Sequence, residues 1–181
     1  MGAARTAIVL IGLRRSGKSS LGLRLAQELR YDFIDLDTLV HRRTGRTPAA
    51  WMSARPIAVG EAAFRTLEAE ALQALLDAGP RDGLVLAAGG GTPTWAPSAA
   101  LLQQLGTVIH LELSADEAAQ RAALDPNPEQ RPLLAGGTAE EEARLLHAER
   151  TPLFRRLAAT NLDASGPPDS VFSALLALFH H

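Results

Sequence analysis

An eight-residue glycine-rich segment places the strongest constraint on how this chain can fold. Residues 12–19, GLRRSGKS, fit the phosphate-binding pattern G-x-x-x-x-G-K-[ST]. The aliphatic run 7–11 comes directly before it and suits a strand that is buried on both faces, and Leu21, Leu25 and Leu29 follow at helical spacing. A strand, a glycine loop and a helix are the context in which this pattern binds phosphate, and a chance glycine-rich turn before a helix is the alternative.

The residue types in this loop indicate how it would hold a nucleotide. Its glycines allow a tight turn, so that successive N–H groups converge on phosphate oxygens at a helix N-terminus. Lys18 would reach the β- and γ-phosphates, and the Ser19 hydroxyl would ligate Mg²⁺. Lys18 is the only lysine among 18 Lys and Arg residues, and the wide fork of an arginine replaces it poorly in such a loop. The predicted nucleotide-binding residues of the loop are Gly12, Arg14, Arg15, Ser16, Gly17, Lys18, Ser19 and Ser20.

Beyond the loop, apolar runs alternate with helical patterns, without repeats or an evident linker. The patterns predict strands at 33–35, 84–88, 107–113 and 161–163, and helices at 61–76, from the capping boxes at 114–117 and 138–141, and at 169–179. Strands that alternate with helices imply a parallel sheet covered on both faces, with ligands outside the carboxyl ends of the strands. Since 181 residues suit one core, we expect a single α/β domain over 1–181.

Composition narrows the class of protein. With 46% hydrophobic and 21% charged residues the chain is typical of globular proteins, and a net charge of −2 argues against nucleic acid as the main partner. The absence of cysteine excludes disulfides and thiolate metal sites, and it suits a reducing cytosol. No apolar run reaches the roughly 18 residues needed to span a bilayer. We therefore expect a cytoplasmic protein with no membrane or nucleic-acid partner.

Two carboxylates lie in the segment Asp35-Leu36-Asp37, which ends the predicted second strand. Asp35 and Asp37 are separated by one residue, and the two-residue period of a strand would point both toward the phosphate site. Because the third predicted strand carries no acidic residue at its end, this pair is the best candidate for supporting Mg²⁺. The alternative is a solvated turn or a helix cap at Thr38.

Glycines and arginines occupy patterned places further along the chain. The triple glycine at 89–91 directly follows a predicted strand and would let a ligand approach bare backbone, although a plain strand-to-helix loop is the alternative. Arg65 and Glu68 are i,i+3 neighbours on a predicted helix, where the simplest interpretation is a surface ion pair. Arg131 closes a loop rich in Pro and Gly that suits a hinged lid, and Arg150 lies near another predicted helix start. Taken singly, each arginine is more simply a solvated charge than a ligand.

In their order and spacing, these segments resemble the shikimate kinases over nearly the whole chain. The matching segments are the phosphate loop, Asp35-x-Asp37, Gly60-Glu61-x-x-Phe64-Arg65-x-x-Glu68, Gly89-Gly90-Gly91, Arg131-Pro132-Leu133-Leu134 and Arg150-x-Pro152-Leu153. The resemblance implies a three-layer P-loop fold of the nucleoside monophosphate kinase type. It has a five-stranded parallel sheet with helices on both faces, a substrate-binding subdomain at 38–66 and a mobile lid at 122–138. It also implies a monomer in which ATP, with Mg²⁺, phosphorylates the 3-hydroxyl of shikimate during aromatic amino-acid biosynthesis.

The same resemblance implies a role for each matching residue. The catalytic set would be Lys18, Asp37 and Arg131, and the metal set Ser19 and Asp35. Asp37 would contact the hydroxyls of shikimate, and two arginines would hold its carboxylate. The substrate-binding set is then Asp37, Arg65, Gly89, Gly90, Gly91 and Arg150. Arg131 would reach the transferring phosphate from the lid, and Arg121 would pack on adenine.

The chain also differs from the pattern of that family. Arg15 stands where the family usually has a third glycine, the segment 51–59 is longer than the usual link, and Phe154 replaces a usual tyrosine near Arg150. Two other functions therefore stay open. One is a P-loop kinase for another small hydroxy acid such as gluconate, and the other is a nucleotide-binding regulatory module without turnover.

Overall fold

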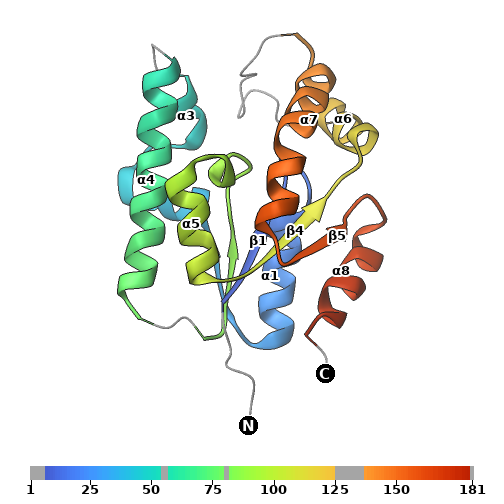
Figure 1. The fold of residues 1–181 in the computed structure, drawn as a ribbon, viewed down its shortest axis with the longest axis horizontal. Helices are drawn as coiled ribbons and strands as arrows, with labels where there is room; N and C mark the ends of the chain where they lie inside the picture. Colours follow the sequence, from blue (N-terminus) through green and yellow to red (C-terminus); the bar gives the residue numbers. More distant parts are fainter. Residues whose placement is uncertain (1–6, 54–56, 80–81, 125–136, 180–181) are drawn as a thin grey trace.

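The computed structural model describes residues 7–53, 57–79, 82–124 and 137–179 (Figure 1). Its strands are β1 (Ala7–Ile11), β2 (Asp32–Asp35), β3 (Leu84–Ala87), β4 (Gly106–Glu112) and β5 (Thr160–Asp163). Its helices are α1 (Lys18–Leu29), α2 (Leu36–Thr44), α3 (Pro48–Met52), α4 (Ile57–Asp77), the 3-10 helix η1 (Thr92–Thr94), α5 (Ala96–Leu105), α6 (Ala115–Ala123), α7 (Ala139–Leu157) and α8 (Pro168–Ala177). The alternation of strands and helices that the sequence predicts is confirmed.

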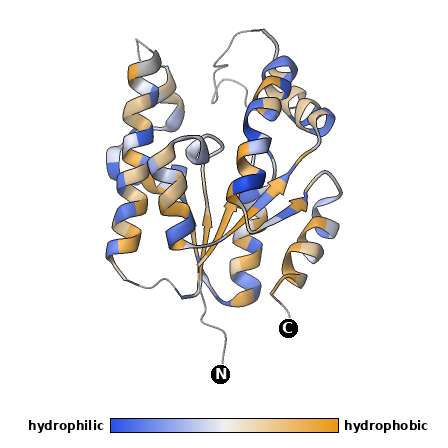
Figure 2. Ribbon diagram, viewed as in Figure 1, coloured by the Kyte–Doolittle hydropathy of each residue, from blue (hydrophilic) through white to orange (hydrophobic). Residues whose placement is uncertain are grey.

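The five strands form one parallel sheet in the order β2-β3-β1-β4-β5. β1 lies at its centre, where Val9 pairs with Leu86 of β3 on one side and with Val108 of β4 on the other. Every residue of β1 and β3 is buried, whereas the edge strands β2 and β5 are half-exposed. Continuous aliphatic runs therefore occupy the middle of the sheet, as strands covered on both faces require (Figure 2).

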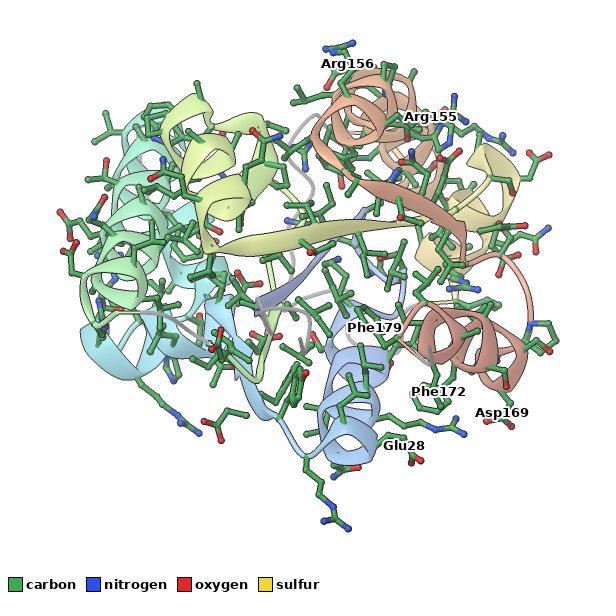
Figure 3. All side chains as sticks on the ribbon, turned by 60° about the horizontal axis from the view of Figure 1, so that its bottom comes forward. Glu28, Arg155, Arg156, Asp169, Phe172 and Phe179 are labelled. Atoms are coloured by element: carbon green, nitrogen blue, oxygen red, sulfur yellow. The ribbon has the colours of Figure 1, made fainter. Side chains whose placement is uncertain are left out.

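Helices cover the sheet on both faces, which gives the predicted three layers. Figure 3 shows α1 and α8 below the sheet, with α5 and α7 above it. The helix α8 is held on α1 by Arg24, whose guanidinium lies 3.8 Å from the ring centre of Phe172 and 2.6 Å from Asp169 Oδ1. The sheet is thus enclosed except at the ends of its strands.

Several elements differ from the sequence-based expectations. The helices α2, α3 and α5 were not predicted, and α7 runs unbroken past Arg150 and through Pro152, so that no new helix begins there. The expected lid falls mainly on 125–136, which lies outside the described residues. The expected substrate-binding subdomain at 38–66 consists of most of α2, the whole of α3 and the first half of α4. These helices stand beside the carboxyl ends of β2 and β3 and form one wall of the site (Figure 1).

Candidate active site

A cavity of about 950 Å³ opens at the carboxyl ends of β1, β2 and β3. The predicted site residues that line it are Arg14, Arg15, Gly17, Lys18, Ser19, Ser20, Asp35, Asp37, Arg65, Gly89, Gly90, Gly91 and Arg150. Gly12, Ser16 and Arg121 do not line it, and Arg131 lies outside the described residues. One cavity therefore unites the phosphate loop, the aspartate pair, the triple glycine and two of the patterned arginines.

The phosphate loop joins β1 to α1 and gives the cavity its first wall. Gly17 has φ 91°, a left-handed conformation that favours glycine, and it forms the N-cap of α1 without a side-chain hydrogen bond. The first N–H groups of a helix have no intrahelical partners, and the helix dipole there favours anions. Lys18 is buried, and its Nζ donates to the carbonyl of Leu13 at 2.7 Å, across the loop. An ammonium and the positive end of a helix dipole therefore meet at one end of the cavity.

Arg15 is held in an unusual conformation within this loop. Its φ is 63°, in the left-handed region that a glycine adopts more easily. Arg121 on α6 donates from Nη1 to the carbonyl of Arg15 at 3.0 Å and from Nη2 to the carbonyl of Ala164 at 2.9 Å. Its Nε lies 2.6 Å from Glu117 Oε1, so its guanidinium is engaged on all three sides. Arg121 thus ties the phosphate loop to the segment after β5.

The aspartate pair has two different settings, and the prediction of a shared strand is wrong. β2 ends at Asp35, whose side chain caps α2 by accepting from the Thr38 N–H at 2.9 Å. Asp37 lies in the first turn of α2 instead of on a strand, because Leu36 turns inward as the first helical residue and is fully buried. The Ser19 hydroxyl donates to Asp35 Oδ2 at 2.6 Å. Both carboxylates nevertheless line the cavity.

Arg65 and Glu68 form a buried ion pair, so the expectation of a surface pair is wrong. Arg65 Nη1 lies 2.6 Å from Glu68 Oε2, and the two residues are 6% and 0% exposed. Burial raises the pKa of Glu68, whereas the charge of Arg65 and a hydrogen bond from Thr92 oppose that rise. The second guanidinium nitrogen, Nη2, lies 3.5 Å from Glu61 Oε1. Two glutamates therefore hold the Arg65 guanidinium in one place against the cavity.

The triple glycine provides the surface on which two arginines meet. A Cβ at Gly91 would lie 2.0 Å from Arg65 Nη2, so only bare backbone permits that guanidinium to lie there. Arg150 on α7 donates from Nη1 to the carbonyl of Gly90 at 3.1 Å. Burial lowers the pKa of Arg150, and the positive charges of Arg65 and Arg14 lower it further. This end of the cavity therefore carries concentrated positive charge, which a bound anion would relieve.

Sequence reasoning missed part of the cavity lining. The additional residues are Thr38, His41, Thr47, Pro48, Ala49, Met52, Phe64 and Ala88. A signal for some of them was present, because Thr47 followed by Pro48 is a helix start, and Thr47 does cap α3 by accepting from the Ala50 N–H. Phe154 does not face the cavity: it is fully buried and packs edge-on against His110.

Comparison with known proteins decides the family. The family model described as shikimate kinase matches residues 14–179. The chain is 36% identical over 178 residues to the shikimate kinase of Nitratidesulfovibrio vulgaris, with 98% of each chain covered. It is 43% identical over 157 residues to that of Mycobacterium avium, with 87% and 83% covered. The chain belongs to the shikimate kinase family.

Solved shikimate kinases have the same fold. The structure of the enzyme from Acinetobacter baumannii, in complex with shikimate, superposes with a TM-score of 0.78 at 33% identity, covering 96% of this chain and 92% of the other. As a member of this family, the chain is an ATP-using kinase with the five-stranded P-loop fold. No helix in its described ranges has both the length and the apolar composition to cross a membrane.

The donor side of this shikimate kinase fits a magnesium nucleotide. The Ser19 hydroxyl and the Asp35 carboxylate are hard oxygen ligands in contact with each other beside Lys18. Among the described residues, no cluster of three or more His, Cys, Asp or Glu side chains could hold a metal by itself. Mg²⁺ in kinases needs only one or two protein oxygens, since phosphates and waters complete its octahedral shell.

Proposed function

We propose that this enzyme transfers the γ-phosphoryl group of ATP to the 3-hydroxyl of shikimate, giving shikimate 3-phosphate and ADP. The observation that carries the assignment is the pair of arginines at the triple glycine, the buried Arg65 and the half-buried Arg150. Shikimate presents one carboxylate and three hydroxyl groups, and a guanidinium fork matches a carboxylate with two parallel hydrogen bonds. The pKa of Arg150 is lowered first by burial and then by the positive charges of Arg65 and Arg14, and a bound carboxylate would offset those charges.

Arg14 adds to the same positive field. It lies in the phosphate loop, and its backbone N would be 3.3 Å from a Cβ at Gly90, so the loop and the triple glycine are in close approach. Its charge also acts on Arg150. Arg14 therefore stands between the two ends of the cavity, where it would favour an anion on either side.

Asp37 is the group best suited to the attacking hydroxyl. Its Oδ1 would lie 2.8 Å from a Cβ at Gly89, so the carboxylate comes close to the backbone at that glycine. A carboxylate at this point would accept the hydrogen bond of an acceptor hydroxyl, orient it toward the phosphate loop and take its proton during transfer. Phosphoryl transfer needs mainly such positioning, together with neutralisation of charge.

On the donor side, the phosphate loop and Lys18 would hold the β- and γ-phosphates, and Ser19 with Asp35 would hold Mg²⁺. When bound, the metal neutralises charge on the transferring group. Arg121 would stack on adenine through the face of its guanidinium while the edge keeps its contacts with the carbonyls of Arg15 and Ala164. Arg131 would bring one more positive charge to the transferring phosphate.

A coupled assay of ADP release tests this function. The enzyme is given ATP and Mg²⁺ with shikimate, with gluconate and with no acceptor. Of the three conditions, we expect ADP release only when shikimate is the acceptor. Turnover with gluconate at the same rate would make the chain a kinase for another hydroxy acid, and nucleotide binding by calorimetry without any turnover would make it a regulatory module.

A further inference from the structure

A buried carboxylate lies behind the acceptor arginine, and each of its oxygens has a fixed donor. Glu68 is fully buried on α4. Its Oε2 accepts from Arg65 Nη1 at 2.6 Å, and its Oε1 accepts from the hydroxyl of Thr92, which is also fully buried. The Glu68 carboxylate therefore has two hydrogen-bond donors: one lies on its own helix, and the other lies 24 residues away in the chain.

The distant donor is itself rigidly placed. Thr92 begins the 3-10 turn η1 immediately after the triple glycine, and its N–H donates to the carbonyl of Gly89 at 3.1 Å. A Cβ at Gly89 would lie 2.8 Å from three atoms at once: Asp37 Oδ1, Glu68 Oε1 and Thr92 Oγ1. The hydroxyl, the two carboxylates and the glycine backbone are thus packed together with no room for rearrangement.

The physical consequence concerns the charge on Glu68. Full burial favours the neutral form of a carboxyl group, and only hydrogen bonds and a paired cation keep such a group ionised. Without the Thr92 hydroxyl, one oxygen would lack its donor while remaining buried. A neutral Glu68 would attract the Arg65 guanidinium less strongly, and Arg65 would then be free to leave its place at Gly91.

We propose that Thr92 is a positioning residue for the acceptor site: its hydroxyl holds Glu68, and Glu68 holds Arg65 in the orientation that binds a carboxylate. The inference rests on the proposed function, because it takes the carboxylate of shikimate as the ligand of Arg65. It adds a residue that touches neither substrate directly. It also predicts a particular kinetic signature, since a misplaced Arg65 weakens acceptor binding without altering the nucleotide site.

The test compares Thr92→Val, which keeps the shape of the side chain, with Thr92→Ser, which keeps the hydroxyl. We expect Thr92→Val to raise the KM for shikimate about 10-fold, with kcat and the KM for ATP each changed less than about 3-fold. Thr92→Ser is expected to stay within about 3-fold of the wild type in all three constants. The matched control is Thr66→Val on α4, the helix that carries Arg65 and Glu68. The Thr66 hydroxyl is exposed and donates to the carbonyl of Ala62, so we expect its loss to leave the kinetics unchanged.

The pH profile separates this role from a general packing role. The charged groups that act on Glu68 are Arg65 on α4 and Asp37 on α2. Glu61 on α4 contacts the same Arg65 guanidinium, and Arg65 and Arg14 in turn act on Arg150 of α7. The pKa of Glu68 is already raised by burial, and removal of the hydroxyl raises it further. The neutral form therefore gains as the pH falls, so the ratio of the Thr92→Val KM to the wild-type KM should be larger at about pH 6 than at about pH 8.5. A packing defect would give the same ratio at both values.

A double-variant cycle completes the test. Glu68→Gln removes the charge through which Thr92 acts, so adding Thr92→Val to Glu68→Gln should raise the shikimate KM less than about 2-fold further. An unchanged KM in Thr92→Val, or effects that simply multiply in the double variant, would overturn the inference. If neither Thr92→Val nor the smaller Thr92→Ala folds, as judged by circular dichroism, the hydroxyl is a stability element and the inference is equally wrong. Failure of the wild-type enzyme to phosphorylate shikimate would instead remove the proposed function.

Discussion

The two ends of the cavity are built in different ways. The phosphate end comes from one continuous segment, in which the loop after β1 leads into α1 and offers backbone N–H groups and the single side-chain ammonium of Lys18. The acceptor end is assembled from α2, α4, the triple glycine and α7, where the buried Glu68 holds Arg65 and the carbonyl of Gly90 holds Arg150. The first end depends on local backbone geometry, and the second on tertiary packing of paired charges.

This contrast has an energetic meaning. A helix N-terminus offers its dipole and free N–H groups wherever the loop folds, so the phosphate end needs few long-range contacts. A buried ion pair is costly to assemble and is damaged severely when one partner is lost, because the other charge stays buried. A substitution at the acceptor end should therefore displace the neighbouring paired residues as well. A substitution at the phosphate end should remove only the contact of the substituted residue.

The largest effect should come from the single cation of the phosphate end. We expect Lys18→Met to lower kcat by about 1,000-fold or more, since no other described side chain can bring an ammonium to that loop. Steady-state kinetics with saturating shikimate measure the loss. Arg24→Met, on the outer surface of the same helix, is the matched control and should keep full activity. Retention of a tenth of the activity by Lys18→Met would contradict the role assigned to the ammonium.

The two aspartates lie between the phosphate end and the acceptor end of the cavity. Substituting each in turn should give different kinetic effects. Asp37→Asn keeps the shape of the side chain but removes its charge, and kcat should fall at least about 100-fold while ATP affinity, measured by calorimetry, changes little. Asp35→Asn should instead raise the Mg²⁺ concentration needed for half-maximal activity. If Asp37→Asn keeps kcat and loses ATP affinity, then Asp37 binds the metal instead of the acceptor hydroxyl. The roles proposed here for Asp35 and Asp37 would then be wrong.

Propagation at the acceptor end can be tested through a backbone position. Gly91→Ala would place its Cβ 2.0 Å from Arg65 Nη2, so the guanidinium must move. We expect the KM for shikimate to rise about 30-fold, with the KM for ATP as the internal control. Because both changes act on one guanidinium, Gly91→Ala combined with Arg65→Ala should be no worse than Arg65→Ala alone. Independent, multiplying effects would show that the glycine and the arginine are separate contributors.

The smallest effect concerns stability at the phosphate end. Arg15 and Arg30 both have left-handed backbones, with φ of 63° and 57°. Glycine relieves about 1–2 kcal/mol of strain at such a position but loses about 0.5–1 kcal/mol in chain entropy, so each change to glycine should stabilise by roughly 0.5–1 kcal/mol. Thermal melts should show Tm higher by about 1–4 °C in each.

Arg30→Gly is the control for Arg15→Gly, because it changes the same backbone strain outside the cavity. Arg30 ends α1 far from the cavity, so Arg30→Gly should leave the KM for ATP unchanged. Arg15 lines the cavity, so Arg15→Gly should change that constant as well as the Tm. An equal gain in Tm with no kinetic change in either variant would mean that the Arg15 side chain takes no part in nucleotide binding.

The same contrast explains what the sequence alone could predict. The phosphate loop, the strands and the helices α1, α4, α6, α7 and α8 follow from short-range patterns, and all five strands were predicted within one or two residues of their observed ends. The position of Asp37 could not be deduced from the two-residue strand period, because the strand ends at Asp35 and a helix begins at the next residue. Where one element ends decides which way every later side chain points.

Burial was the other quantity that local patterns did not reveal. Arg65 and Glu68 have the spacing of an ordinary surface pair, and only the packing of α4 against η1 and the triple glycine makes them a buried one. The contact of Glu68 with Thr92 joins residues 24 positions apart, and the periodicity of neither segment predicts it. Long-range contacts of this kind need the tertiary structure, because a side chain's spacing on its own helix does not say what covers it.

The lone lysine gives this enzyme an unusual chemical property. Apart from the α-amino terminus, the only amine in the chain is the Lys18 Nζ, which is buried within the phosphate loop. Amine-directed reagents, such as acylating agents, fluorescent esters or activated surfaces, therefore find no other lysine side chain with which to react. Labelling of this one position becomes a direct measure of whether the nucleotide site is occupied, and a conjugation that spares Lys18 must attach through the α-amino terminus.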